Sequence, residues 1–389
     1  MIRRLQARGV TCLAAVGVAA LCAACGSTKA PASGHAAAPA TAPAQSLAYS
    51  EATSEATWAA LPMGAASGPN EFWQLFLLPA GQHTWRLDTP PDIATNGAIE
   101  LGGLSGTSLV VGIRASLALA YSPVSLTGNA GTTWTAGPPA QSLASVPDGL
   151  AATAQGSHIL ALTTTGEVNT ASATSTGWTK LTSESSLAAT SAARACGVDQ
   201  LTAVAYSPAS APLVATSCRD AGQAGIFTLA SGTWRSDGPA LPAQLSGSSV
   251  AVVRLVTSAD QTTALLLATD GTRRELLAAS VGSTGKWTMS APLNLGASSI
   301  RTTSFGAAGA IALLLSNGRA EILAGGTGTW KETEPVPAGT SATIALPGGG
   351  QTDALTASGS LLTVWQFTAG GQWVKAQTIK VPIQYGSSS

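Results

Sequence analysis

The residues that could carry chemistry in this chain are few and scattered. Only 10% of the 389 residues are charged, with 19 acidic and 19 basic side chains, three histidines and four tyrosines. His35, His83 and His158 are too few and too far apart for a metal cluster or a histidine-based triad. The chain has no glycine-rich phosphate loop, no zinc-ligand spacing and no Gly-x-Ser-x-Gly elbow. The sequence therefore indicates no cofactor and no metal.

Carboxylates are the remaining source of catalysis. Two acids that flank a sugar can hydrolyse a glycosidic bond, and any two of the 19 could converge in the fold. Asp270 stands in a turn, and Glu332 and Glu334 flank a short strand, where solvated edge positions are expected. No pair is marked out by spacing, so the sequence predicts no catalytic residue and an enzyme is the less favoured interpretation.

Two of the five cysteines predict a disulfide. Cys196 and Cys218 are the pair that lies outside the N-terminal leader, 22 residues apart. Apolar runs at 201–206 and 213–216 predict adjacent strands that would let the two side chains meet where the strands open. Outside the cytoplasm such a lone pair forms a disulfide, whereas a metal site would need more ligands.

The N-terminus predicts export and lipid attachment. Three arginines within the first eight residues precede an uncharged run, 10–24, which is too short for a membrane span and typical of a signal peptide. The run ends in Ala23-Ala24-Cys25, which resembles the bacterial lipoprotein signal. The resemblance implies that Cys25 carries a lipid and becomes the new N-terminus. Cys22 stands where that signal usually has leucine, so a secretory signal cleaved nearby is the alternative.

These features divide the chain into four segments. We expect a signal peptide at 1–24, a lipid-anchored disordered tether rich in alanine and proline at 25–45, a folded domain at 46–385 and a disordered tail at 386–389. Without the three leader arginines the chain has 16 basic and 19 acidic residues, a net charge of −3. It therefore lacks the basic surface that nucleic-acid binding requires.

Seven tryptophans recur at the end of glycine-containing turns. They are Trp85, Trp134, Trp178, Trp234, Trp287, Trp330 and Trp373. Their spacings are 49, 44, 56, 53, 43 and 43 residues, with a mean of 48, close to the length of one four-stranded propeller blade. At a fixed place in every repeat, we expect these rings to be structural and packed between sheets rather than to form a carbohydrate platform.

Each repeat also contains two apolar runs joined by a tight turn. Asp270-Gly271 and Asn317-Gly318 lie between such runs and are strong hairpin signals. The runs are continuous rather than alternating, which is typical of strands with both faces buried. The sequence therefore predicts an all-β chain whose segment 46–385 is a seven-bladed β-propeller, with six or eight blades as the alternatives.

One repeat spells out a known turn motif. Its residues are Thr127, Asn129, Gly131, Thr133 and Trp134. This stretch resembles the Asp-box of sialidase-type and related BNR-repeat propellers, with asparagine in place of the usual aspartate. The resemblance implies a structural hairpin turn, in which side-chain oxygens bind turn amides and the aromatic ring packs beneath. The Arg-Ile-Pro segment that sialidases carry is absent.

The favoured function is a lipid-anchored, extracytoplasmic propeller of the bacterial cell envelope that acts as a monomeric binding or scaffolding module. Its expected partners are the membrane, through the lipid, and an envelope protein or glycan bound by loops at a mouth of the central channel. The alternative is a glycan-active enzyme, a hydrolase or lyase, that uses channel-facing carboxylates; a purely structural surface protein is the third possibility. Acids, arginines or tyrosines gathered at one mouth would separate these interpretations.

Overall fold

The computed structural model describes residues 49–382, except for 54, 65–70, 92–97, 115–123, 137–146, 155, 173–174, 176, 259, 340 and 349–350. These residues belong to one compact unit, 39–389. The expected signal peptide, tether and C-terminal tail, with Cys25, lie outside the described residues.

The described residues form seven four-stranded antiparallel blades, numbered I to VII along the chain. Blade I contains β1 (Tyr49–Ala52), β2 (Ala56–Gly64), β3 (Glu71–Pro79) and β4 (Arg86–Leu87); blade II contains β5 (Ala98–Ser105), β6 (Ser108–Arg114), β7 (Val124–Thr127) and β8 (Thr135–Ala136). Blade III contains β9 (Pro147–Ala152), β10 (His158–Thr163), β11 (Glu167–Ser172) and β12 (Thr179–Ser183); blade IV contains β13 (Val198–Tyr206), β14 (Pro212–Cys218), β15 (Gly225–Ala230) and β16 (Thr233–Ser236).

The three remaining blades follow the same plan. Blade V contains β17 (Ser249–Thr257), β18 (Thr262–Asp270), β19 (Arg273–Val281) and β20 (Trp287–Met289), and β21 (Leu293–Asn294) also pairs with β19. Blade VI contains β22 (Ile300–Phe305), β23 (Ile311–Leu315), β24 (Ala320–Leu323) and β25 (Lys331–Glu332); blade VII contains β26 (Ser341–Ala345), β27 (Asp353–Ser358), β28 (Leu361–Phe367) and β29 (Trp373–Lys380). Short helices, α1 (Glu184–Ala188) and two 3-10 turns (Ala243–Leu245, Ala307–Gly309), lie in connections.

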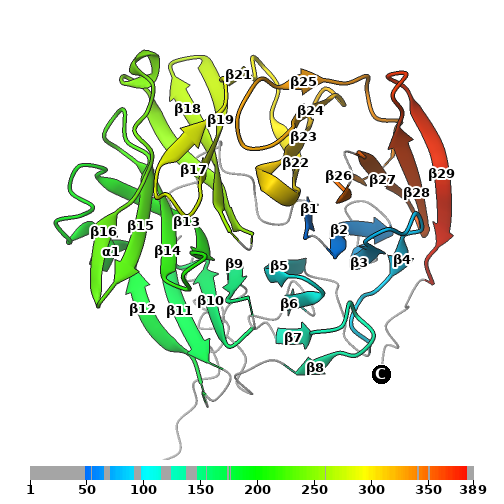
Figure 1. Cartoon of the computed structure of the whole chain (residues 1–389), viewed down its shortest axis with the longest axis horizontal. Helices are drawn as coiled ribbons and strands as arrows, with labels where there is room; N and C mark the ends of the chain where they lie inside the picture. The colour runs from blue at the N-terminus through cyan, green and yellow to red at the C-terminus, as the bar shows by residue number, and fades with distance from the viewer. Residues whose placement is uncertain are drawn as a thin grey trace, which may run out of the picture. The chain divides into compact units, whose positions relative to one another are not determined.

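The blades are arranged in a ring, as the sequence predicts. Figure 1 shows β1, β5, β9, β22 and β26 nearest the centre, and β8, β12, β16 and β29 at the rim. The inner strands β1 and β22 pair in parallel, and β13 and β17 both run antiparallel to β14, so inner strands share one direction. We call the side of the ring at which the inner strands begin the start face.

Burial of both strand faces explains the continuous apolar runs. In β18, Leu265 and Leu267 pack towards blade VI, whereas Leu266 between them packs towards blade IV. Because successive side chains of a strand point to opposite faces, a blade between two neighbours needs apolar residues at every position. The β18–β19 hairpin then turns at Asp270 and Gly271, the latter with a φ of 56° that glycine tolerates.

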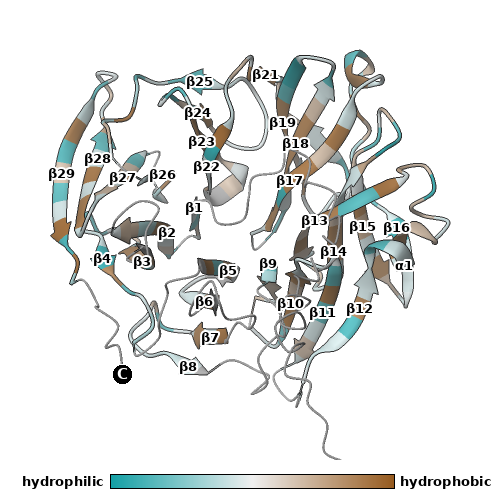
Figure 2. Cartoon of the chain, turned by 180° about the vertical axis from the view of Figure 1, so that it is seen from behind, coloured by the Kyte–Doolittle hydropathy of each residue, from teal (hydrophilic) through white to brown (hydrophobic). Residues whose placement is uncertain are grey.

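Apolar side chains of neighbouring blades form a cluster at each of the seven interfaces in the described ring. The outer strands are more polar, and Figure 2 shows hydrophilic stretches on β25 and β29. The core is therefore divided among the interfaces, because each blade buries its two faces against its two neighbours. The blades depend on one another for that burial.

The first and last blades close the ring mainly through side chains. Blade I and blade VII each consist of consecutive strands of their own segment, without strand exchange in the described residues. Trp85 Nε1 donates a 2.9 Å hydrogen bond to Asp353 Oδ2, and the Gln377 side chain bonds both the backbone N–H and the carbonyl of Trp85. Nearer the axis, Ser50 Oγ donates to the Ile344 carbonyl at 2.7 Å.

Candidate functional site

Charged side chains from distant blades meet near the ring axis. Glu51 of β1 and Glu100 of β5 are each 6% exposed. Arg254 of β17 extends to both: its Nη2 lies 2.7 Å from Glu51 Oε1, and its Nη1 lies 3.9 Å from Glu100 Oε1. Blade V adjoins neither blade I nor blade II, so this arginine links opposite sides of the ring.

A third carboxylate makes this axial cluster rich in acid. Burial raises the pKa of the Glu51 carboxyl, against the lowering effect of Arg254. Burial also raises the pKa of Glu100 well above its ordinary value; Arg254 opposes this rise, whereas the charges of Glu51 and Asp148 add to it. Burial raises the pKa of Asp148 itself to about 6. Burial and the mutual repulsion of the carboxylates therefore favour their protonated forms, against the single opposing charge of Arg254.

The axial cluster was not recognised in the sequence, because no local pattern marks it. Its members come from strands that begin about 50 to 200 residues apart, and each stands in an ordinary apolar strand context. Raised carboxyl pKa values are a property of many active sites, but also of structural ion-pair networks. Here Glu51 and Glu100 are buried and paired with Arg254, which suits a structural network better than a substrate site.

Three inner strands carry a charged residue in a β-bulge at the start face. In each strand the second residue is skipped by the pairing with the next strand: Asp148 in β9, Asp199 in β13 and Arg301 in β22. A bulge adds one unpaired residue and re-aims its side chain. The Asp199 side chain is 51% exposed and Arg301 is exposed. The start face therefore presents fixed charges of both signs around the axis.

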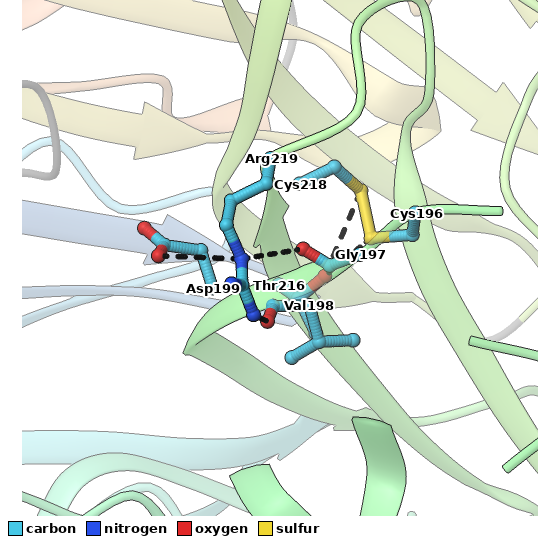
Figure 3. The surroundings of a disulfide bond; sticks show 7 residues. All are labelled: Cys196, Gly197, Val198, Asp199, Thr216, Cys218 and Arg219. Carbon is cyan, nitrogen blue, oxygen red and sulfur yellow. Dashed lines mark hydrogen bonds and ion pairs between the residues drawn. A yellow bond between two sulfur atoms is a disulfide. The ribbon is translucent and has the colours of Figure 1, made fainter. Parts of the chain in front are cut away.

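A cavity of about 220 Å³ lies on the start face between blades IV and V. It is lined by Asp199, Ser217, Cys218, Arg219, Ser249, Val250, Ala251, Leu267 and Thr269. Figure 3 shows Arg219 between Asp199 and the backbone carbonyls of Gly197 and Val198. Charged and hydroxyl-bearing residues therefore border it.

The two cysteines expected to pair are joined in the structure, beside this cavity. Cys196 and Cys218 form a disulfide with a Cα–Cα distance of 4.8 Å, and both are buried. The bond ties the segment that contains α1 to the end of β14. Ser183 caps α1 by accepting a hydrogen bond from the Ser186 N–H. Because Gly197 and Val198 directly follow Cys196, the disulfide also holds the backbone carbonyls that orient Arg219.

The seven repeat tryptophans occupy equivalent places, each at or just before the outer strand of its blade. Each ring packs in the apolar cluster between its own blade and the preceding one; for Trp85 the preceding blade is VII. Trp85 is 1% exposed, whereas the other six are only partly buried. They lie at the rim, where a blade has no further strand to cover them.

Several of these rings also form hydrogen bonds across the interface. The indole N–H groups of Trp287, Trp330 and Trp373 donate to backbone carbonyls just beyond the outer strand of the preceding blade, at 2.6, 3.1 and 2.9 Å. Because the contact is the same each time, these tryptophans tie each blade to the preceding one. They do not converge on one surface that could hold a ligand.

The Asp-box-like stretch forms the turn between β7 and β8. Thr127 Oγ1 accepts from the Gly131 N–H and Asn129 Oδ1 accepts from the Thr133 N–H, both at 2.9 Å. Gly131 has a φ of 72°, which favours glycine. Trp134 packs beneath, edge-on to Trp58 with ring centroids 6.3 Å apart. Asparagine thus supplies the acceptor oxygen that aspartate would supply.

The remaining candidates do not come together in the structure, although Glu332 forms an ion pair with Arg319. His83 and His158 are exposed and lie in different blades, and Glu332 and Glu334 are exposed near the rim. Within the described ranges no three histidine, cysteine or acidic side chains are placed to hold a metal ion. Over the same ranges, no helix is long and apolar enough to cross a membrane.

No protein-family model matches the sequence, and no curated protein matches it. Solved structures do match in fold. The periplasmic gluconolactonase PpgL of Pseudomonas aeruginosa is 15% identical, with a TM-score of 0.53 over 84% of this chain and 97% of that chain. The GH74 xyloglucanase of Xanthomonas campestris is 12% identical, with a TM-score of 0.50 over 86% of this chain and 54% of that chain.

A further match is YCF48 from Cyanidioschyzon merolae, which is 14% identical over 86% of this chain and 96% of that chain, with a TM-score of 0.45. At such low identities the solved structures establish the β-propeller fold and nothing more specific. What this chain does must be argued from its own residues.

Proposed function

We propose that the chain is a lipid-anchored, extracytoplasmic binding or scaffolding module of the bacterial cell envelope, which engages its partner on the start face. The observation that carries this proposal is the contrast between two sets of charges. Glu51 and Glu100 at the axis are buried and paired with Arg254, whereas Asp199 and Arg301 on the start face are exposed and stand in bulges. Fixed, exposed groups on a rigid scaffold are typical of recognition surfaces.

The anchor rests on the sequence alone. Cys25 is the proposed lipid attachment site, and the segment 26–45 would span roughly 25 Å as a flexible chain. The lipid would tie the protein to the cell membrane, and the tether would hold the propeller clear of the bilayer surface. We propose that the protein is a monomer and binds an envelope protein or glycan, not nucleic acid.

The anchor is tested by changing Cys25→Ala. The variant should leave the detergent phase and appear in the aqueous phase of a phase-partition assay, while the parent stays with detergent. Metabolic labelling with a fatty-acid analogue should tag the parent only. Retention of the variant in the detergent phase would place the anchor elsewhere.

The binding surface is tested by reversing its charges in the intact, membrane-attached protein. In vivo cross-linking should give discrete adducts for the parent and fewer for the double variant Asp199→Lys and Arg301→Glu. Lys286→Glu is the control, because Lys286 is exposed in the β19–β20 turn on the opposite face of the ring. If Lys286→Glu loses as many adducts as the double variant, the start face is not the partner surface.

A glycan-active enzyme is the second candidate, because one observation favours it. Three carboxyl groups with raised pKa values, Glu51, Glu100 and Asp148, converge at the axis, and glycoside hydrolysis uses a pair of carboxyls of which one is held protonated. If this candidate were correct, the purified protein would release products from cell-wall or storage polysaccharides, and Glu100→Gln would abolish the release. A protein that binds but releases nothing supports the binding module.

A further inference from the structure

The outer half of blade VII is longer than that of the other blades. Its outer strand β29 has eight residues, whereas the outer strands of the other described blades have two to five. In the preceding blade VI the outer strand β25 consists of Lys331 and Glu332 alone. Figure 1 shows β28 and β29 side by side at the rim. Much of this hairpin therefore has no equally long neighbour to cover the side that points towards blade VI.

The pairing of β28 with β29 determines which side chains share that uncovered side. Leu362 and Val364 pack in the cluster between blades VII and I. Because side chains alternate along a strand, the residues between them point towards blade VI. One of these is Trp365, whose partner across the hairpin is Lys375. We call this surface the blade VII face; it contains Leu361, Trp365 and Phe367 of β28 and Trp373, Lys375 and Lys380 of β29.

Trp365 differs from the other nine tryptophans of the chain. Each of those nine belongs to, or packs against, one of the seven interface clusters of the described ring, whereas Trp365 does not. Its ring is partly exposed, and its Nε1 donates a 3.0 Å hydrogen bond to Thr356 Oγ1. Thr356 lies in the neighbouring strand β27, diagonally across the sheet from Trp365. The indole is therefore held leaning over the sheet and keeps part of its surface open to solvent.

Two further aromatic rings continue this surface. Phe367 and Trp373 are partners across the hairpin, with ring centroids 5.0 Å apart, and both are partly exposed. Trp373 is also held by its hydrogen bond to the Glu334 carbonyl. Groups fixed in this way lose little conformational freedom when a ligand binds, which favours affinity.

The blade VII face is also basic. Lys375 and Lys380 are exposed, and residues 361–380 contain no acidic residue. The exposed Lys331 of β25 points to the same interface, because its partner Ile322 packs towards blade VII. In the part of the chain that the structure describes, none of the three lysines forms an ion pair, with Glu334 or with any other acid.

We infer that the blade VII face binds an acidic polysaccharide of the cell envelope. A sugar ring has an apolar C–H side, which can pack on the exposed parts of Trp365 and Phe367. Carboxylate or phosphate groups on the polysaccharide would accept charge-assisted hydrogen bonds from the lysines. Between Leu361 and Phe367 the strand rises by roughly 20 Å, so the face extends over more than one sugar unit.

Two other occupants fit this surface less well. An acidic peptide would have to add to the edge of β29, but the β28–β29 ladder skips Ala376 in a bulge. A bulge and exposed lysines on an edge strand oppose the addition of another strand. A second copy of this chain, paired edge to edge, would bring its own Lys375 and Lys380 against the same two lysines.

The test is titration of the full-length protein, in detergent, with soluble acidic polysaccharides. Polygalacturonate, hyaluronate and alginate supply carboxylates, and a phosphomannan supplies phosphate. Fully methyl-esterified polygalacturonate is the matched neutral probe, and poly-glutamate and a single-stranded oligonucleotide are polyanions of other classes. Calorimetry should show that at least one acidic polysaccharide binds more tightly than all three of these comparators, with an affinity that falls as salt is added. If no acidic polysaccharide binds, or if poly-glutamate or the oligonucleotide binds more tightly, the inference is wrong.

Variants locate the binding on the blade VII face. Trp365→Ala should weaken it about tenfold with little change in melting temperature, because Trp365 lies outside the interface clusters. Trp365→Phe keeps a ring and should retain most of the affinity. Lys375→Glu should also weaken binding, whereas the same change at the exposed Lys286, in the β19–β20 turn, should not. Binding that survives Trp365→Ala, or equal weakening by the two lysine variants, would reject this site.

The blade VII face includes neither Asp199 nor Arg301, so this inference goes beyond the proposed function and the two can fail separately. Envelope adducts that depend on the start face, with no polysaccharide binding, would reject the blade VII site and keep the binding module. Polysaccharide binding that requires Trp365, with adducts insensitive to the start-face variant, would keep the blade VII site and reject the start face as the partner surface.

Discussion

The rim of the ring repeats one contact, whereas the axis uses each of its contacts once. At the rim, Trp287, Trp330 and Trp373 donate in the same way to the preceding blade. At the axis, Arg254 meets Glu51 and Glu100 in a network that no other blade repeats within the described residues. A repeated contact needs only its own blade and one neighbour, while the axial network needs the whole ring to be assembled.

This difference separates contacts that stabilise one interface from contacts that depend on the assembled ring. Each of these tryptophans buries apolar area and forms at most a few hydrogen bonds, so replacing it should destabilise mainly one blade interface. The axial network joins non-adjacent blades, and its free energy depends on the protonation of the acids. The following changes test that division, from the largest expected effect to the smallest.

Trp85→Ala should be the most damaging change at the rim. Trp85 is 1% exposed, and its loss would also leave the buried Asp353 carboxylate without the indole donor. We expect a loss of about 5 kcal/mol in the free energy of unfolding. The half-buried Trp330, changed to alanine, should cost roughly half as much. Chemical denaturation of both variants checks this, and equal losses would contradict the unequal burial.

Arg254→Leu should make stability strongly dependent on pH. The pKa values of Glu51 and Glu100 are already raised by folding, so their contribution is complete at low pH and is lost as pH rises through the folded values. Without the arginine, both values rise further. We expect a cost of about 3–4 kcal/mol at pH 8 and less than half of that at pH 5.

The matched control for this change is the triple variant Glu51→Gln, Glu100→Gln and Arg254→Leu, which has no buried charge left at these three positions. Its unfolding free energy should vary less with pH than that of Arg254→Leu. If the single variant shows the same loss at pH 5 and pH 8, packing rather than charge explains it.

Loss of the disulfide should affect the start face of blade IV rather than the ring as a whole. Changing both Cys196→Ala and Cys218→Ala should lower the free energy of unfolding by about 3 kcal/mol, because the bond closes a loop with a separation of 22 residues. Limited proteolysis should then cut first between 184 and 197. First cuts elsewhere, with 184–197 protected, would mean that the disulfide does not hold this segment.

Asp88→Asn should give the smallest effect of these changes. Burial raises the pKa of Asp88 to about 7, despite the nearby Arg86. Its stabilising contribution is therefore present at low pH and lost as pH rises through 7. The variant should match the parent near pH 3, below the ordinary carboxyl pKa, and exceed it by about 1–2 kcal/mol at pH 8.5. A melting-temperature series over pH tests this, and parallel curves would refute it.

The sequence allowed the rim to be predicted better than the axis. The tryptophan period gives the seven blades, and Asp270-Gly271 gives a hairpin turn, because both depend on residues close together in the chain. The partial exposure of six tryptophans was missed, since a period does not say whether another strand covers a ring. Glu51, Glu100 and Arg254 were missed for a different reason: their meeting depends on ring closure, and no local pattern encodes it.

The side-chain closure between the first and last blades has a consequence for biosynthesis. Trp85 and its partner Asp353 are 268 residues apart in the chain. At about 5–20 residues per second, translation alone separates them by roughly 15–50 s. During that interval the face of blade I that packs on blade VII, which includes Leu61 and Phe76, has no covering blade. The nascent chain thus has a defined period of vulnerability to aggregation and proteolysis, which ends only when the seventh blade emerges.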